Sequence, residues 1–316
     1  MIFTRPDQVH HPLYVIAPIF NPVRFRSRWK LYADFAKMIK DAGGILYTVE
    51  VAFGGRDFAL EKLNPENYIK LRSSHELWLK ENVINVAFTK LPIDWERAAW
   101  IDADVVFSRP DFINETLQQL EHYKVVQMWS QSADLSPNFE VLRQFRSYAY
   151  CQNNGIPRKG LVDFSEYGAE YHHPGYAWAI RRDAYDQLGG LIDWAILGGG
   201  DLFMANALYD QEYKPPKSLG DNGIRMLNIW RDRALRYIKK NVGYVDGLIL
   251  HHWHGKKTDR KYQDRGTILT EAKFNPEIDL IKDTQGLWQL NIENIALRDG
   301  IRNYFRSRNE DSIDLE

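Results

Sequence analysis

The chain has 316 residues, of which 44% are hydrophobic and 26% charged, and its formal net charge is −1. These values are ordinary for a globular protein with a full core, and they argue against a chain that coats nucleic acid through bulk charge. No apolar run reaches the ~20 residues that a membrane span needs, and no N-terminal stretch has the pattern of a signal peptide. The single cysteine, Cys151, excludes an intramolecular disulfide, so we expect a cytoplasmic protein.

The first part of the chain predicts alternating strands and helices. Apolar runs alternate with segments of helical spacing, and glycine or proline residues separate them. Strands are expected at residues 13–20, at 45–53 and before Asp102, and helices at 26–40, at 76–84 and after Pro110. This alternation is typical of right-handed crossover units on a mostly parallel sheet, with ligands beyond the carboxyl ends of the strands. We therefore expect an α/β fold whose nucleotide-binding half covers residues 1–125.

The second half, residues 126–290, is less regular, and we expect it to complete a single domain on the acceptor side. Its first segment, residues 130–168, is polar and predicts a helix followed by a long loop over an active site. Further strands are expected at 177–180 and 245–250, and helices at 201–209 and 222–240. Residues 291–316 predict a C-terminal helix and an acidic tail, whose composition favours disorder.

Two carboxylates, Asp102 and Asp104, end the apolar run that begins at Trp100. Ionised carboxylates beside apolar walls are costly unless a cation or a hydrogen-bond network compensates them. A divalent metal that carries a diphosphate is one such partner. Because an Asp-x-Asp pair alone is common by chance, the prediction depends on the residues downstream.

A cluster of histidines, His251, His252 and His254, follows the apolar run at 245–250. Imidazole and carboxylate ligands suit Mn²⁺ and similar ions, although histidines at a strand end also form local hydrogen bonds without a metal. Basic residues come directly after, and three of them could bind phosphate oxygens: Lys256, Lys257 and Arg260.

A glycine-rich turn precedes Asp201. The run Gly198-Gly199-Gly200 lets the backbone approach a ligand closely and places Asp201 at the start of a helix. Asp201 could be a simple N-cap residue. Alternatively, its carboxylate is a general base that removes a proton from an incoming hydroxyl or amine.

Taken in this order, the motifs resemble those of GT-A fold glycosyltransferases over roughly residues 13–290. The segments His251-x-Trp253-His254-Gly255-Lys256-Lys257 and His173-Pro174-Gly175 resemble a subgroup of enzymes from bacteria and their phages. The resemblance implies a metal-dependent transfer of a sugar from a nucleotide-diphosphate sugar, with UDP as the default nucleotide and Mn²⁺ or Mg²⁺ as the metal. In one position the chain departs from the pattern, because Gly200 stands where inverting members often carry an acidic residue.

The resemblance also implies site residues. Asp104 would bind the metal directly, Asp102 would contact the metal or the ribose, and His251 or His254 would complete the metal site. Asp201 would be the base of an inverting reaction. The nucleotide and diphosphate would be bound by Pro18, Phe20, Asn21, Arg26 (or Arg28), Lys80, Asn82, Ala103, Lys256, Lys257 and Arg260. The sugar or the acceptor would lie against Gly175, Tyr176, Trp178, Gly199 and Gly200.

Several alternatives stay open for the substrate. The acceptor could be a glycan, a lipid or a protein, or it could be a hydroxymethylated pyrimidine in phage DNA. Residues 225–265 are basic and could bind phosphates of a duplex. A nucleotidyltransferase would also use paired aspartates, but it would normally show a glycine-rich basic loop after the first strand. A non-catalytic sugar-binding protein would not need the aspartates, the histidines and Asp201 together.

Overall fold

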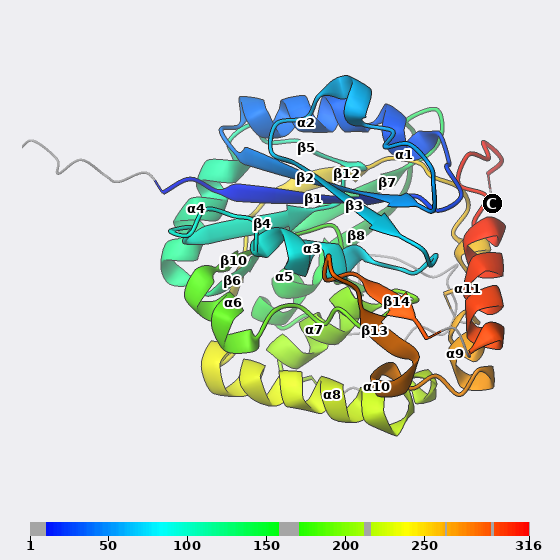
Figure 1. Cartoon of the computed structure of the whole chain (residues 1–316). Helices are drawn as coiled ribbons and strands as arrows, with labels where there is room; N and C mark the ends of the chain where they lie inside the picture. The colour runs from blue at the N-terminus through cyan, green and yellow to red at the C-terminus, as the bar shows by residue number, and fades with distance from the viewer. Residues whose placement is uncertain (1–10, 158–170, 212–215, 263, 292–293, 316) are drawn as a thin grey trace, which may run out of the picture.

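The computed structural model of the chain describes residues 11–157, 171–211, 216–262, 264–291 and 294–315. At its centre is a seven-stranded sheet with the strand order β11-β6-β10-β4-β1-β2-β3 (Figure 1). Its strands are β1 (Tyr14–Phe20), β2 (Ile45–Phe53), β3 (Tyr68–Ser73), β4 (Arg97–Ile101), β6 (Val125–Gln127), β10 (Ala177–Arg181) and β11 (Val242–Tyr244). Strand β10 is antiparallel to β4 and β6, and the other pairs in this sheet are parallel. The predicted α/β class with a mostly parallel sheet is confirmed.

Helices cover both faces of this sheet. Strand β1 is apolar along its length, so its side chains enter two cores in alternation: Val15 and Ala17 pack with α2 and α4, and Ile16 packs on the side of α3. On the first face lie α2 (Tyr32–Asp41) and α4 (Phe112–His122), and on the second lie α3 (Lys80–Phe88), α6 (Arg182–Leu188), α7 (Gly200–Leu208) and α8 (Gly220–Arg233). Figure 1 shows α2 and α8 on opposite sides of the sheet.

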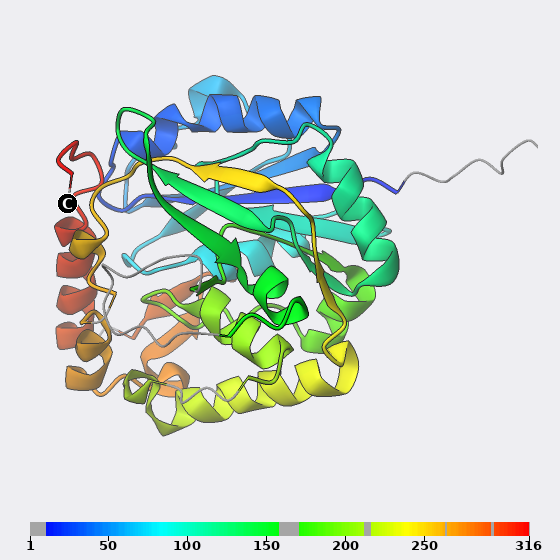
Figure 2. The same ribbon diagram turned by 180° about the vertical axis from the view of Figure 1, so that it is seen from behind.

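A second, five-stranded sheet has the order β5-β12-β7-β8-β9, and Figure 2 shows β7, β8 and β12 nearest the viewer. Its strands are β5 (Val105–Phe107), β7 (Gln131–Leu135), β8 (Val141–Ser147), β9 (His172–His173) and β12 (Leu248–His251). The prediction of a helix and a long loop for residues 130–168 misses two strands: the described part of this segment forms β7 and β8 before the helix α5 (Tyr148–Asn153). Part of the long loop that we expected there lies outside the described residues.

The remaining elements are short or lie in the last third of the chain. They are α1 (Ser27–Lys30), α9 (Gly266–Glu271), α10 (Pro276–Asp279), β13 (Leu280–Lys282), β14 (Trp288–Leu290) and α11 (Ile295–Ser307), with a π-helical turn at Ala234–Ile238 and 3-10 turns at Glu61–Leu63, Lys217–Leu219 and Thr258–Arg260. Within the described ranges, we find no helix with the length and apolarity that a bilayer crossing requires.

The C-terminal tail is packed against the body of the molecule, where composition favoured disorder. Helix α11 contributes Leu297, Ile301 and Phe305 to the larger core. After it, the side chain of Glu310 is buried, and Asp311 accepts hydrogen bonds of 2.8 and 2.9 Å from the backbone N–H groups that begin α1. The expectation fails because basic and backbone donors from distant segments meet these acids.

Candidate active site

A cavity of about 300 Å³ opens beyond the carboxyl ends of β1 and β4. These two strands are neighbours in the sheet, and the chain leaves β1 toward β2 on one side and returns to β4 on the other. Such a reversal of strand order is where ligands bind in open α/β sheets. Asn21 follows β1 and Asp102 follows β4, and both line the cavity.

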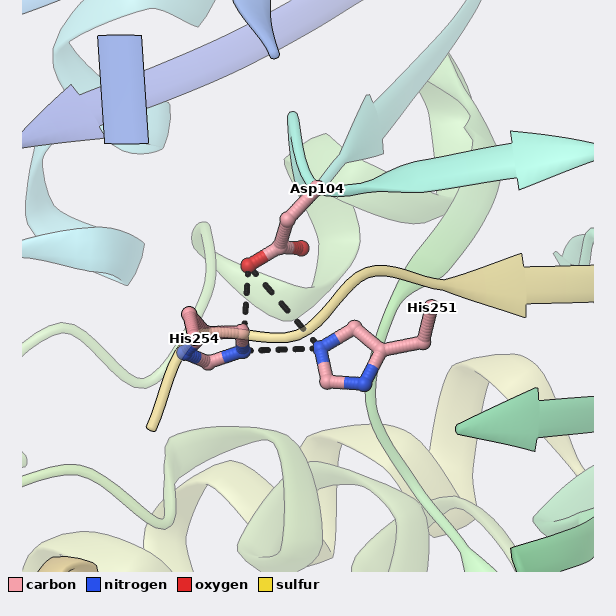
Figure 3. A group of neighbouring side chains, drawn as sticks. All are labelled: Asp104, His251 and His254. Carbon is pink, nitrogen blue, oxygen red and sulfur yellow. Dashed lines mark hydrogen bonds and ion pairs between the residues drawn. The ribbon is translucent and has the colours of Figure 1, made fainter. Parts of the chain in front are cut away.

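At one end of the cavity, Asp104, His251 and His254 converge (Figure 3). Oδ2 of Asp104 lies 3.9 Å from Nε2 of His251 and 3.4 Å from Nε2 of His254, and the two Nε2 atoms are 2.9 Å apart. All three side chains are buried. In the described part of the chain, this is the one group of three such side chains close enough to share a metal ion.

Strand register brings this cluster together. In the second sheet, His251 of β12 pairs with Val105 of β5, so it lies beside Asp104, which directly precedes β5. On its other side His251 pairs with Asp134 of β7. Paired residues in adjacent strands project to the same face, so Asp134 reaches the histidine ring.

Asp134 orients His251. Oδ1 of Asp134 lies 2.8 Å from Nδ1 of His251, and the hydroxyl of Tyr176 donates to the same oxygen at 2.9 Å. Burial opposes ionisation of Asp134, but the hydrogen bond from His251 and the Lys257 ammonium outweigh it and hold its pKa well below the usual range. An ionised carboxylate only accepts, so Nδ1 of His251 is the donor in this bond and Nε2 is the ring atom directed into the cluster.

The second histidine is surrounded by guanidinium groups. Nη2 of Arg28 lies 3.3 Å from Nδ1 of His254, and Nη2 of Arg260 lies 3.1 Å from it. Burial and these two cations keep the pKa of His254 well below its ordinary value. Because guanidinium groups only donate, His254 can bind a cation through Nε2 only as the Nδ1–H tautomer, in which these contacts to Nδ1 are lost.

The donor set of the cluster fits a divalent metal ion. Oδ1 of Asp104 is buried and has no hydrogen-bond partner among the described residues. Burial opposes ionisation of Asp104, yet His251 and Arg28 lower its pKa, so the carboxylate is charged. One carboxylate and two imidazoles suit Mn²⁺ and similar borderline ions. Asp104, His251 and His254 are therefore the residues that would hold a metal here.

Asp102, which we predicted as a second metal ligand or a ribose contact, lies outside this cluster. Its two carboxylate oxygens bind Nζ of Lys80 at 2.6 and 2.8 Å. Burial opposes the charge on Lys80, but Asp102 outweighs it and raises the pKa of the ammonium group. Both residues of the pair line the cavity, and Asp201 is close enough for its charge to act on Lys80 as well.

Cationic side chains line the cavity beside the cluster, and the C-terminal tail binds two of them. Glu310 accepts hydrogen bonds from Nε of Arg28 and from Nε of Arg308, each at 2.6 Å. Burial alone would raise the pKa of Glu310, but Arg28 and Arg308 lower it strongly. Burial also opposes ionisation of Tyr262, yet Arg260 and Arg308 lower its pKa to about 8. Arg308 and Glu310 were absent from the sequence prediction, since the tail looked disordered.

Asp201 also lines the cavity, and it lies in the first turn of α7 rather than on the strands that carry the cluster. The residue before the helix is Gly199, with φ of 94°, so the N-cap is the glycine, and the alternative that Asp201 is the N-cap is not what the structure shows. Oδ1 of Asp201 accepts a hydrogen bond from the backbone N–H of Leu202 at 2.8 Å. The left-handed conformation at Gly199 favours glycine and directs the start of α7 toward the cavity.

Most of the predicted binding residues line the cavity: Pro18, Phe20, Asn21, Lys80, Ala103, Gly175, Tyr176, Gly199, Lys257 and Arg260. The others do not line it: Arg26, Asn82, Trp178, Gly200 and Lys256.

Two of those five have structural partners instead. The Asn82 amide binds the backbone of Gly286 and Trp288 at 3.0 and 2.9 Å. The indole of Trp178 donates to the carbonyl of Pro174 at 2.7 Å. Arg28 lines the cavity, whereas the side chain of Arg26 is exposed.

No family model and no curated protein matches the sequence. Solved structures are similar at low identity. A mutant of Drosophila β1,4-galactosyltransferase 7 in complex with manganese, UDP-Gal and xylobiose is 10% identical, with a TM-score of 0.39, and the match covers 74% of this chain and 65% of that one. Glucosyl-3-phosphoglycerate synthase from Mycobacterium tuberculosis, in complex with Mn²⁺, UDP and phosphoglyceric acid, is 12% identical, with a TM-score of 0.37 and coverages of 79% and 76%. S. aureus TarS in complex with UDP is 11% identical, with a TM-score of 0.39 and coverages of 63% and 55%.

Proposed function

We propose that this protein is a metal-dependent glycosyltransferase that moves a sugar from a UDP-sugar to an acceptor hydroxyl group of a glycan, a lipid or a protein. The observation that carries the proposal is the arrangement of one cavity at the ends of β1 and β4. A buried carboxylate–imidazole cluster (Asp104, His251 and His254), several cationic side chains and the carboxylate of Asp201 at the start of α7 all line it.

The charged end suits a diphosphate leaving group. When the bond between the sugar and the diphosphate breaks, negative charge grows on the phosphate oxygens. Arg28, Lys257 and Arg260 line the cavity and can donate charge-assisted hydrogen bonds to those oxygens. A divalent ion held by the cluster would add Lewis-acid stabilisation of the same charge.

The aromatic wall suits the nucleoside. Phe20, Trp78 and Phe305 all line the cavity. The rings of Phe20 and Trp78 meet edge to face at 5.2 Å, and those of Trp78 and Phe305 are stacked at 6.5 Å. Together with Asn21, which follows β1, these rings offer apolar surface and one polar side chain to a pyrimidine and its ribose.

Asp201 is the proposed base. Its carboxylate takes the proton of the acceptor hydroxyl while the acceptor oxygen forms a bond to the anomeric carbon. The bond from that carbon to the diphosphate breaks on the opposite side, and the electron pair leaves with the UDP. One displacement of this kind inverts the anomeric configuration.

The test is release of nucleoside diphosphate from UDP-glucose, UDP-galactose, UDP-N-acetylglucosamine and GDP-mannose. Each donor is offered with hydroxyl acceptors, including monosaccharides, glycerol and duplex DNA with hydroxymethylcytosine. We expect UDP release with Mn²⁺, reduced by roughly a hundredfold or more with a chelator or in Asp104→Ala. The exposed ion-pair variant Asp111→Asn is the matched control. Release of pyrophosphate instead of UDP would assign a nucleotidyltransferase and contradict the proposal.

A further inference from the structure

Glu81 is a buried acid that the mechanism above does not use. It lies in the first turn of α3, its side chain is buried, and it lines the same cavity as Asp201. A Cβ atom added to Gly200 would stand 2.9 Å from Cδ and 3.1 Å from Oε1 of Glu81. The carboxyl group of Glu81 therefore fills the space that a side chain at position 200 would take, next to Asp201.

The Glu81 carboxyl group has no hydrogen bond from another residue in the part of the chain that the structure describes. Its neighbour Lys80 binds both carboxylate oxygens of Asp102 instead. Buried polar groups in folded proteins are almost always hydrogen-bonded. The carboxyl group of Glu81 interacts with its own backbone N–H. Because it is buried, lines the cavity and has no other hydrogen bond among the described residues, it is placed to bind a polar group of a ligand.

A protonated Glu81 can bind more kinds of polar groups than an ionised one. Burial raises the pKa of Glu81 to about 8, and the negative charge of Asp201 adds to this effect while Lys80 opposes it. A carboxyl group that keeps its proton near neutral pH can both donate and accept a hydrogen bond. Sugar hydroxyl groups have the same two capacities, so a single hydroxyl can satisfy it.

The neighbours of Glu81 belong to both parts of the proposed site. The charges of Lys80, Asp102 and Asp201 all act on Glu81, and its carboxyl group lies against Gly200, next to Asp201. If the proposed function holds, the diphosphate lies at the cationic end and the acceptor hydroxyl lies at Asp201. The transferred sugar joins the two and must lie between them.

We propose that Glu81 is a specificity-determining residue whose carboxyl group binds a hydroxyl group of the transferred sugar, beside Asp201. This inference rests on the proposed function. It also explains how a chain with glycine before Asp201 presents two acids at this end of the cavity, since the second acid comes from α3 rather than α7.

The experiment is calorimetric binding in Mn²⁺ of UDP and of three UDP-sugars: UDP-glucose, UDP-galactose and UDP-N-acetylglucosamine. The proteins are the wild type, Glu81→Ala, Glu81→Gln and the control Glu115→Gln, which alters an acid in the first turn of α4. For each protein, the ratio of the Kd of a UDP-sugar to the Kd of UDP isolates the contribution of the sugar.

For the sugar that the wild type binds best, we expect this ratio to rise about tenfold or more in Glu81→Ala, with the Kd of UDP unchanged within about twofold. Glu81→Gln keeps a hydrogen-bonding amide and should show a smaller rise, and it provides the measurement if the alanine variant does not fold. Ratios unchanged for all three sugars in the folded variants would overturn the inference and leave the proposed function standing. Absence of Mn²⁺-dependent UDP binding by the wild type would overturn both.

Discussion

The candidate active site holds two groups of acids with different neighbours: Asp104 and Asp134 on the strands, and Glu81 and Asp201 at the starts of helices. At the end built by β5, β12 and β7, the carboxylates of Asp104 and Asp134 lie against Arg28, His251 and Lys257. At the end built by the first turns of α3 and α7, Glu81 and Asp201 lie near each other, and the nearby ammonium group of Lys80 is bound to Asp102. The first arrangement keeps acids ionised, which suits cation binding, and the second suits proton exchange.

The contrast follows from how each end is built. Strand register fixes Asp104, Asp134 and His251 on neighbouring strands, so their donors and acceptors are paired before any ligand arrives. The other end depends on two helix starts and on a missing side chain at Gly200. Substitutions at the two ends should therefore have different effects: loss of metal binding at one, and loss of rate or sugar recognition at the other.

The largest expected effect is on the rate. Asp201→Asn removes the proposed base and should lower kcat by about a thousandfold, because general-base catalysis contributes roughly 10²–10⁴-fold. Its half-buried side chain accepts one local hydrogen bond, which an amide oxygen can still accept, so UDP binding with Mn²⁺ should change little. Steady-state kinetics and calorimetry measure the two quantities. A kcat within a few-fold of wild type would remove Asp201 from the mechanism.

The next effect is on stability. Glu310→Ala removes the carboxylate that pairs with the buried Arg308 and the half-buried Arg28, and breaking a buried pair costs about 3–5 kcal/mol. We expect a decrease of about 3 kcal/mol in the free energy of unfolding, measured by urea denaturation. Asp314→Ala, at an exposed position in the same tail, is the control and should be near neutral. Equal stabilities of the two variants would show that the ion pairs of Glu310 with Arg28 and Arg308 do not stabilise the fold.

A smaller effect is expected on metal affinity. Asp134→Asn keeps the shape of the side chain but replaces the charged acceptor by a neutral amide, which holds His251 as the Nδ1–H tautomer less strongly. Loss of such an orienting carboxylate typically lowers metal affinity about 10–100-fold. A Mn²⁺ titration of UDP release should therefore shift to higher metal concentration while the rate at saturating metal changes less. An unshifted titration, with Asp111→Asn again as control, would show that Asp134 does not orient the histidine.

A further effect is a pH dependence of stability at Glu81. The pKa of Glu81 is raised from 4.5 to about 8 in the folded protein, so its proton is retained on folding between these values. Wild-type stability is full below the unfolded pKa and is lost as the pH rises toward 8. Glu81→Gln cannot ionise, so its melting temperature should match wild type near pH 4.5 and exceed it increasingly up to pH 8. A difference that does not vary with pH would contradict the buried, protonated state.

Much of the first sheet could be predicted from the sequence because its signals are local. The apolar run of β1, the helical spacing of α2 and the apolar strand before Asp102 lie where they were expected. The aspartate and histidine residues that form the cluster were also candidates, since carboxylates and imidazoles at strand ends carry the chemistry of metal binding in their side chains.

The remaining features depend on contacts between distant segments. Strands β7 and β8 are polar in sequence, and they form by pairing with each other and, for β7, with the distant β12. His251 and Asp134 are 117 residues apart. Glu81 looks like a surface acid at a helix start, and only the packing of α3 against α7 buries it. Glu310 belongs to a tail whose composition favours disorder, and Arg28 and Arg308 order it. No periodicity in the sequence encodes these contacts.

The central claim is that Asp104, His251 and His254 bind a divalent ion that supports UDP binding. The most direct measurement is calorimetric titration of UDP into wild type, Asp104→Ala and His251→Ala, each with Mn²⁺ and with a chelator. We predict binding by the wild type in Mn²⁺, and a loss of about tenfold or more in affinity with the chelator or in either variant. UDP affinity that is equal with Mn²⁺ and with chelator, in all three proteins, would contradict the account.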